Sequence, residues 1–152
     1  MVRLSIGLSL WLLFTASLSA SDDPVRVIFD TDMDTDCDDA GALAMLHALA
    51  DVGEANILAT VVSSRYPWSV PCAAAINGWY ARPDLPIGCP KQGGAPTNRG
   101  SRYARKIAEQ FPSRFKTNDD APAATDVYRR VLASQPDRSV VIVTVGYVTN
   151  MR

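Results

Sequence analysis

Short apolar runs and longer segments with helical spacing alternate along most of the chain. The β-branched run at 25–29 suits a buried parallel strand, the run at 56–62 predicts a second strand, and the run at 139–145 carries the strongest strand signal. Helical spacing covers residues 41–50, 70–81, 101–111 and 121–134. A short strand is predicted at 86–89, within a loop rich in proline and glycine. Strands that alternate with helices predict an α/β fold with an open, mainly parallel sheet and flanking helices.

The segment 41–50 is apolar on nearly every face, so we expect a buried helix there. Asp38 or Asp39 stands directly before it and is expected to cap it, because negative charge interacts favourably with the amino-terminal end of a helix.

The first twenty residues carry a pattern of their own. Arg3 provides a positive charge, residues 8–14 are apolar, and small residues follow at Ser17, Ser19 and Ala20. This order is typical of a secretory signal peptide that is cut near Ala20. The apolar stretch is shorter than the roughly 20 residues of a membrane-spanning helix. We therefore expect a secreted or periplasmic protein with a mature domain over 21–152 and no membrane contact after cleavage.

Length, composition and charge narrow the classes of function. A chain of 152 residues is of one-domain size, and 47% hydrophobic with 20% charged residues suits a globular core. The net charge of −1 gives no electrostatic basis for binding nucleic acid or an anionic membrane. The three cysteines have no zinc-like spacing, and we interpret them as structural or incidental. The single histidine, His47, lies among alanines and leucines, and we interpret it as a core or rim residue.

Six aspartates within ten residues are the most informative feature of the chain; they are Asp30, Asp32, Asp34, Asp36, Asp38 and Asp39. They directly follow the first predicted strand, and no lysine or arginine lies among them. So many carboxylates cannot ionise side by side in a folded protein without a compensating positive charge. Hard cations prefer carboxylate, carbonyl and water oxygens, and ligands of open α/β sheets bind at the carboxyl ends of strands. The pattern therefore favours a cation site over a solvated acidic turn.

Two known carboxylate patterns fit this run poorly. A calcium-binding EF-hand loop needs glycine at its sixth and glutamate at its twelfth position, where counting from Asp30 gives Thr35 and Gly41. Phosphoryl-transfer enzymes with an aspartyl nucleophile also follow a strand with Asp-x-Asp, which would make Asp30 the nucleophile and Asp32 its acid partner. They usually carry Thr or Val two residues further on, where this chain has Asp34. That pattern also leaves the pair at 38–39 unexplained.

A third pattern fits better. Residues 27–44 read Val-Ile-Phe-Asp-Thr-Asp-Met-Asp-Thr-Asp-Cys-Asp-Asp-Ala-Gly-Ala-Leu-Ala. This stretch resembles the amino-terminal signature of the inosine/uridine-preferring nucleoside hydrolase family. Residues 57–64 are similar to the family's second strand and its loop, and Val-Gly-Tyr-Val-Thr-Asn at 145–150 is similar to its Gly-Pro-Leu-Thr-Asn turn. The resemblance covers only the amino-terminal half of a typical member, and the sequence stops where a further element is expected to begin. We therefore expect a cut through a larger domain.

The resemblance implies a calcium-dependent hydrolase that cleaves the N-glycosidic bond of a small nucleoside, giving ribose and free base. It implies that Asp32 both ligates Ca²⁺ and acts as general base, and that Asp39 also ligates Ca²⁺. Asp38 matches a carboxylate that contacts a ribose hydroxyl, and Asp30 matches a supporting acid at the strand end. Val145 matches the position whose backbone carbonyl reaches the metal. A homo-oligomer is also implied.

The chain departs from the family pattern in places that bear on function. The signature carries two extra residues, and Asp34 stands where glycine is usual; we expect its side chain to face solvent. Ser63 and Ser64 replace the family's Gly-Asn, which puts a polar contact to the sugar in question. The carboxyl-half residues of the family site are not in this sequence, so we expect little or no activity from the 152 residues alone. Two other functions stay open: a calcium-dependent ribosyl-binding module without catalysis, and a phosphoryl-transfer enzyme that uses Asp30.

Overall fold

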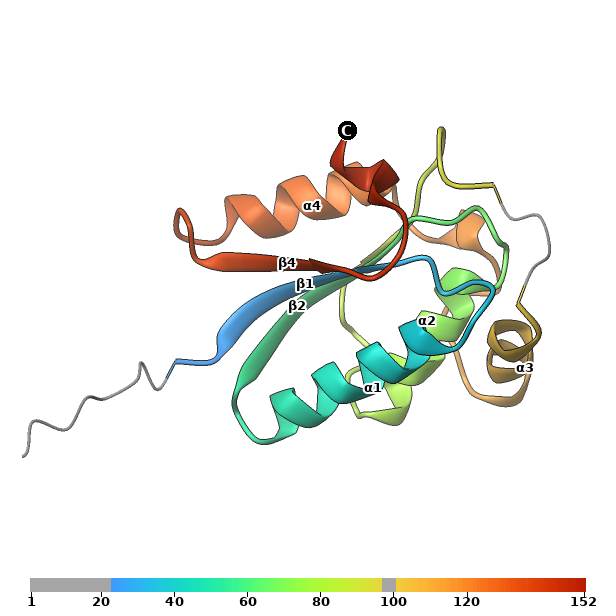
Figure 1. Ribbon diagram of the computed structural model, residues 1–152, viewed down its shortest axis with the longest axis horizontal. Coiled ribbons are helices and arrows are strands. Elements are labelled where there is room, and N and C mark those ends of the chain that lie inside the picture. The colour runs from blue at the N-terminus through green and yellow to red at the C-terminus, as the bar shows by residue number, and fades with distance from the viewer. Residues whose placement is uncertain (1–22, 97–100) are drawn as a thin grey trace, which may run out of the picture.

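The computed structural model describes residues 23–96 and 101–152, so the segment predicted as a signal peptide lies outside the described residues. Within this part of the chain, four parallel strands form a sheet in the order β3-β2-β1-β4 (Figure 1). The strands are β1 Val25–Thr31, β2 Ala55–Val62, β3 Ile87–Gly88 and β4 Val140–Thr144. This confirms the prediction of an open parallel α/β sheet, with β1 paired on both of its sides.

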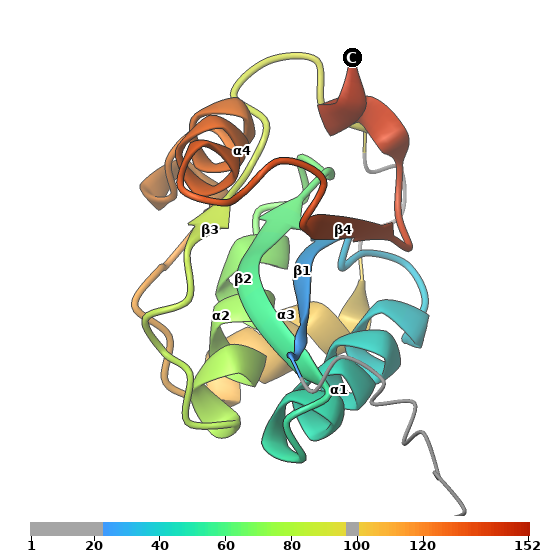
Figure 2. The same ribbon diagram turned by 90° about the vertical axis from the view of Figure 1, so that its left-hand side faces the viewer.

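Helices cover both faces of the sheet. They are α1 Asp38–Asp51, α2 Ser69–Trp79, α3 Arg102–Gln110 and α4 Ala124–Ala133, with the short 3₁₀ turns η1 Asn118–Asp120 and η2 Val148–Met151. Figure 2 shows α1, α2 and α3 on one face and α4 on the other. Each predicted helix is present, with its ends shifted by at most three residues.

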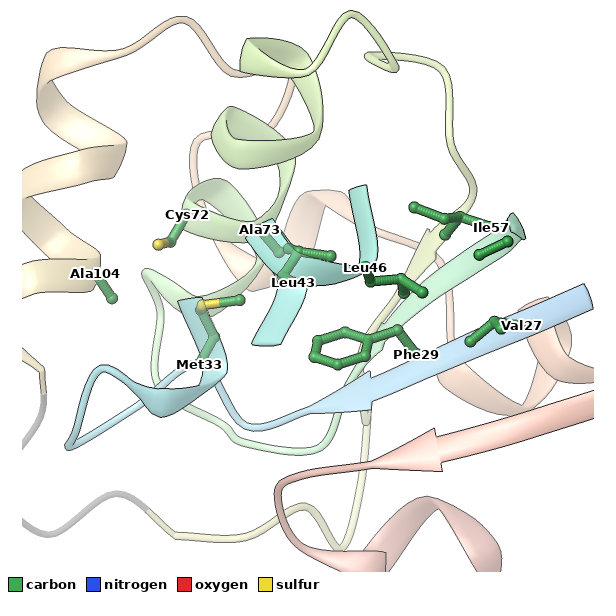
Figure 3. Packing of buried hydrophobic residues seen from close by; sticks show 10 residues of the cluster. Val27, Phe29, Met33, Leu43, Leu46, Ile57, Cys72, Ala73 and Ala104 are labelled. Carbon is green, nitrogen blue, oxygen red and sulfur yellow. The ribbon is translucent and has the colours of Figure 1, made fainter. Parts of the chain in front are cut away.

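Alternate residues of β1 pack into different layers of the core. Val27 and Phe29 lie in a cluster with Leu43 of α1 and with residues of α2 and α3 (Figure 3). Ile28 lies in a second cluster with Val127 of α4. Because successive side chains of a strand point to opposite faces, β1 is covered on both sides, as its continuous apolar sequence predicts.

The helix α1 differs from its prediction at its start and in its burial. It begins at Asp38, so both aspartates lie in its first turn, and its N-cap is Cys37 without a side-chain cap bond. Capping by Asp38 or Asp39 is therefore wrong. Full burial is wrong as well, because Met45 is 67% exposed while only one side of the helix packs on the sheet. An apolar sequence without a polar face gives no signal for which side will be covered.

The cysteines agree with their interpretation as structural or incidental residues. Cys37 is exposed, Cys72 and Cys89 are buried, and none of the three forms a disulfide within the described residues. Burial raises the pKa of the Cys72 thiol to about 12, which disfavours a nucleophilic thiolate. Among the described residues there is also no helix with the length and apolar content that crossing a bilayer requires.

His47 is the centre of a buried polar network between α1 and α2. Its Nε2 lies 2.9 Å from Oδ1 of Asn77, and its Nδ1 lies 3.4 Å from Nη1 of Arg82. Because a guanidinium only donates hydrogen bonds, Nδ1 accepts and Nε2 carries the proton, so the ring is neutral. Asn77 donates in turn to the Thr60 hydroxyl, and Arg82 forms an ion pair with Asp51 at 2.6 Å. The complete burial of His47 agrees with its interpretation as a core residue.

We predict that protonation of His47 destabilises the fold in mildly acidic solution. Burial lowers the pKa of His47 below its ordinary value of 6.5, and neighbouring Arg82 lowers it further, whereas Asn77 and Asp51 raise it in part. The unfolded chain therefore takes up this proton at a higher pH, and the contribution of His47 to stability is lost as the pH falls through the unfolded value. Urea unfolding at about pH 7.5 and about pH 5.5 measures the effect. His47→Gln should lose less stability between the two conditions than wild type, and an equal loss in both proteins would contradict the prediction.

Candidate functional site

The six aspartates gather around the carboxyl end of β1, one of the two inner strands of the sheet. Asp30 is part of β1, Asp38 and Asp39 form the first turn of α1, and the others lie in the connection between these elements. We call residues 30–39 the acidic segment. Figure 1 shows that the connection lies at the same end of the sheet as the carboxyl ends of β2 and β4. Open α/β sheets bind their ligands at this end.

Asp30 is a buried acid that holds three elements together. Its Oδ2 accepts hydrogen bonds from the Tyr128 hydroxyl of α4 at 2.7 Å and from Nδ2 of Asn150 in η2 at 3.0 Å. Its Oδ1 is buried and has no hydrogen-bond partner among the described residues. Burial raises the pKa of Asp30, and the bonds from Asn150 and Tyr128 lower it in part. These contacts fix the position of Asp30, and its role as a supporting acid stays a prediction.

Asp32 and Asp39 lie against each other. Asp32 is half-buried, and its Oδ1 accepts a hydrogen bond from the backbone N–H of Asp34 at 3.0 Å. Burial, followed by the hydrogen bond and the negative charge of Asp39, raises the pKa of Asp32 to about 7. Asp39 is buried, and the hydroxyl of Thr31 donates to its Oδ1. Two carboxylates that lie against each other repel when both are ionised, so the pair of Asp32 and Asp39 is well placed to bind a cation.

A second grouping of carboxylates extends the site outward. One oxygen each from Asp36, Asp38 and Asp39 lies within 4.8 Å of the other two. Asp39 belongs both to this group and to the pair with Asp32, so it links two other residues expected from the sequence, Asp32 and Asp38. Asp36 was not among the expected site residues, although it stands in the same alternating run. Asp36 and Asp38 are exposed, which leaves their oxygens accessible to a ligand from solvent.

Asp34 does not face solvent, so the sequence-based expectation for it is wrong. Its side chain is 4% exposed, and its Oδ2 accepts a hydrogen bond from the Ser64 hydroxyl at 3.0 Å. Ser64 follows β2, and its Oγ also accepts the backbone N–H of Tyr66 at 3.0 Å. The expectation failed because the partner stands thirty residues away, in the loop at the end of the neighbouring strand.

The turn after β4 approaches the acidic segment closely. The backbone N–H of Val145 donates to the carbonyl of Asp30 at 3.0 Å. A Cβ atom on Gly146 would lie 2.4 Å from the backbone nitrogen of Asp32, so no side chain fits at this position. The turn continues to Asn150, whose Nδ2 also donates to the carbonyl of Val62 at 2.9 Å. Val145 thus lies beside the acidic segment, and its role as a carbonyl ligand stays a prediction.

The residues present fit a hard divalent cation. The side-chain donors are all carboxylate oxygens, which Ca²⁺ prefers. The described residues form two ion pairs, Arg82–Asp51 and Arg105–Glu109, and neither involves an acid of residues 30–39. These ion pairs therefore do not offset the repulsion between Asp32 and Asp39. A cation bound among these oxygens would offset it.

The fold is similar to that of a known enzyme. The solved structure of a plant nucleoside hydrolase matches this chain with a TM-score of 0.60 and 24% sequence identity, over 84% of this chain and 41% of that one. Comparisons with protein-family profiles and with curated proteins gave no match. A likeness at this identity shows a nucleoside hydrolase-like α/β fold. The chain spans less than half of the length of that neighbour, and membership of the inosine/uridine-preferring family stays a prediction.

We predict that Gly146→Ala disrupts the junction between the turn and the acidic segment. The added methyl group would overlap the Asp32 backbone, so the two segments must separate. We expect a loss of about 1–3 kcal/mol in the free energy of unfolding, measured by urea denaturation. Gly41→Ala is the matched control, because a Cβ at this position in α1 meets nothing within 4 Å. The control should be neutral or more stable by about 0.5–1 kcal/mol, and equal behaviour of the two variants would contradict the close approach.

Proposed function

We propose that this chain carries part of a calcium-dependent nucleoside hydrolase site, which cleaves the N-glycosidic bond of ribonucleosides to give ribose and free base. The observation that carries the proposal is the cluster of acids at the carboxyl end of β1, in which Asp39 lies against Asp32 and also groups with Asp36 and Asp38. The nucleoside hydrolase-like fold supports it, because the acids stand at the ligand-binding end of that fold. With the predicted signal peptide, the proposed activity belongs outside the cytoplasm.

The proposal assigns the metal to the oxygens of Asp32 and Asp39 and to the backbone carbonyl of Val145. When bound there, Ca²⁺ would hold sugar hydroxyls and a water in one coordination sphere and so supply orientation. Asp36 belongs to the same group of oxygens as Asp39 and is available as a further ligand.

The side chains divide the chemistry among them. Asp32 takes a proton from the attacking water, whose oxygen then bonds to the anomeric carbon while the bond to the base nitrogen breaks. The base leaves with the electron pair of that bond. Asp38, exposed in the first turn of α1, accepts a hydrogen bond from a ribose hydroxyl. The ionised acids also stabilise the positive charge that develops on the sugar in an oxocarbenium-like transition state.

Of the two alternative functions, the structure argues against phosphoryl transfer and is compatible with a ribosyl-binding module. Asp30 is completely buried and bonded to Tyr128 and Asn150, so it is poorly placed to attack a phosphate as the nucleophile of a phosphoryl-transfer enzyme. A ribosyl-binding module without catalysis would use the same calcium site and is separated from the hydrolase by activity alone. Both remaining functions require a cation, which makes ion binding the first experiment.

We predict that the chain binds Ca²⁺ and that Asp32→Asn weakens this binding on the order of tenfold or more, because one carboxylate charge is lost from the site. Isothermal titration calorimetry of the purified chain measures the affinity. Asp137→Asn is the matched control, since Asp137 is an exposed acid in the turn before β4 and should leave the affinity unchanged. A wild-type chain that binds no Ca²⁺ would contradict the proposal.

Release of ribose decides between the hydrolase and the binding module. Purine and pyrimidine ribonucleosides are incubated with the chain and with Ca²⁺, and free ribose is measured by a reducing-sugar assay. A hydrolase predicts ribose release that a calcium chelator and Asp32→Asn both abolish, even where the rate is low. Calcium binding without any ribose release favours the binding module, and release that persists in Asp32→Asn rules out Asp32 as the base.

A further inference from the structure

The strand β4 lies at one edge of the sheet and yet has the sequence of an inner strand. Within the described residues it pairs with β1 on one side only, as Figure 2 shows. Its five residues at 140–144, Val-Val-Ile-Val-Thr, include no charged residue, proline or glycine. An open edge is a template for pairing with another chain, and natural edge strands are usually protected by charged residues, by proline or by a very short length. β4 has none of these protections.

Apolar side chains of β4 are exposed on both faces of the sheet. Val143 aligns with Phe29, whose side chain packs on the α1 side, and Ile142 aligns with Ile28, which packs on the α4 side. Because aligned residues of neighbouring strands point to the same face, Val143 points to the α1 side and Ile142 to the α4 side. Val141 lies on the same face as Val143, and all three are exposed, Val141 most of all at 48%. Each face therefore offers apolar surface at this edge.

The backbone groups on the outer side of β4 are unpaired within the described residues. The N–H of Val145 donates to the Asp30 carbonyl at 3.0 Å, so it points to β1. The backbone groups of successive residues in a strand point to opposite sides. The N–H of Val143 therefore also points to β1, whereas the N–H and C=O groups of Ile142 and Thr144 point outward. These outward groups are available to a further strand.

The opposite edge of the sheet is closed. β3 has only two residues, and its Ile87 is buried. The helix α4 packs directly against β3, so that a Cβ on Gly88 would lie 3.0 Å from the Cα of Ala124. Two open edges would let copies of the chain add without end, whereas a single open edge is used up when two copies pair. Association of copies through β4 therefore gives a closed dimer.

We propose that β4 is an interface between two copies of this chain, which pair antiparallel about a twofold axis. With Ile142 opposite the same residue of the second copy, each outward N–H donates to the outward carbonyl across the axis. Val140 pairs with Thr144 of the second copy in the same way. Val141 then lies opposite Val143 of the second copy on the α1 side, so β-branched apolar side chains meet across the interface. The edge is thus complementary to itself in both its hydrogen-bonding groups and its side chains.

The charge of the acidic segment favours this antiparallel arrangement. The segment lies at the carboxyl end of β4, where Gly146 meets the Asp32 backbone. Antiparallel pairing separates the acidic segments of the two copies by the length of the strand, about 17 Å, which exceeds the Debye length of about 8–10 Å at moderate salt. At the amino end of β4, the exposed Asp137 and Arg138 together carry no net charge to repel the acidic segment of the second copy. A parallel pairing would instead bring both acidic segments to the same end.

Sedimentation velocity of the purified chain, with a chelator present, tests the interface independently of the proposed function. Wild type should show a monomer–dimer equilibrium. Val141→Lys places a charge in the interface, and Thr144→Pro removes an outward N–H while the bonds to β1 remain, so each should raise the dissociation constant about tenfold or more. Met45→Lys is the matched control, because Met45 is exposed on α1, which packs against β2 and α2, and it should dimerise as wild type does. A monomeric wild type, an open-ended series of larger species, or dimers unaffected by Val141→Lys and Thr144→Pro would each overturn the inference.

Hydrogen exchange in wild type, followed by NMR, gives a readout that does not depend on the folding of a variant. The amides of Ile142 and Thr144 face solvent in the monomer and are hydrogen-bonded in the proposed dimer. Their exchange should slow about tenfold or more between protein concentrations well below and well above the dissociation constant. Val143 is the internal control, because its N–H points to β1 and is protected in the monomer as well. Exchange at Ile142 and Thr144 that stays fast at every concentration overturns pairing through β4.

Discussion

The repulsion between carboxylates at the end of one central strand is the constraint on which this structure depends. Asp30 and Asp39 are buried, and a buried carboxylate is costly unless donors or a cation compensate it. Neutral groups donate hydrogen bonds to several of these carboxylates. Hydroxyl groups donate to Asp30, Asp34 and Asp39, and the side-chain amide of Asn150 also donates to Asp30. Among the described residues, the Asp32 side chain accepts a backbone N–H and lies against Asp39, whose charge helps to raise the pKa of Asp32. Neutral donors thus compensate Asp34 and one oxygen of Asp30, whereas the pair of Asp32 and Asp39 is where a cation is proposed to bind.

The same donors also hold the fold together. Tyr128 brings α4 to the end of β1 from 98 positions along the chain, and Asn150 brings η2 from 120 positions away. Asn150 further donates to the carbonyl of Val62, which joins β2 to the same point. The acidic segment is therefore a junction of the fold as well as a site. A change that removes one of these donors will affect stability and ligand binding together, which is why the variants chosen above keep the bonded donors of Asp30.

The sequence predicted what depends on local pattern and missed what depends on distant partners. Strand and helix positions, and the placement of the aspartates at a strand end, follow from periodicity and chain order. The burial of Asp34 did not follow, because its partner Ser64 lies on another strand end. Tyr128 was not singled out either, since a tyrosine at helical spacing has the pattern of an ordinary core residue. Only the packing of α4 places its hydroxyl beside the carboxylate of Asp30.

Two positions at which the sequence departs from the pattern it resembles are linked by one hydrogen bond. Asp34 stands where glycine is usual, and Ser64 stands where asparagine is usual, and in the structure the hydroxyl of the one residue bonds to the carboxylate of the other. Each change would be unfavourable alone, because a buried carboxylate at 34 needs a donor and Ser64 would lose its acceptor. Together they direct the polar group at position 64 into the protein, away from a sugar. The pair therefore fixes this loop beside the acidic segment, and under the proposed function contacts to a sugar would be made by groups that remain accessible, such as Asp38.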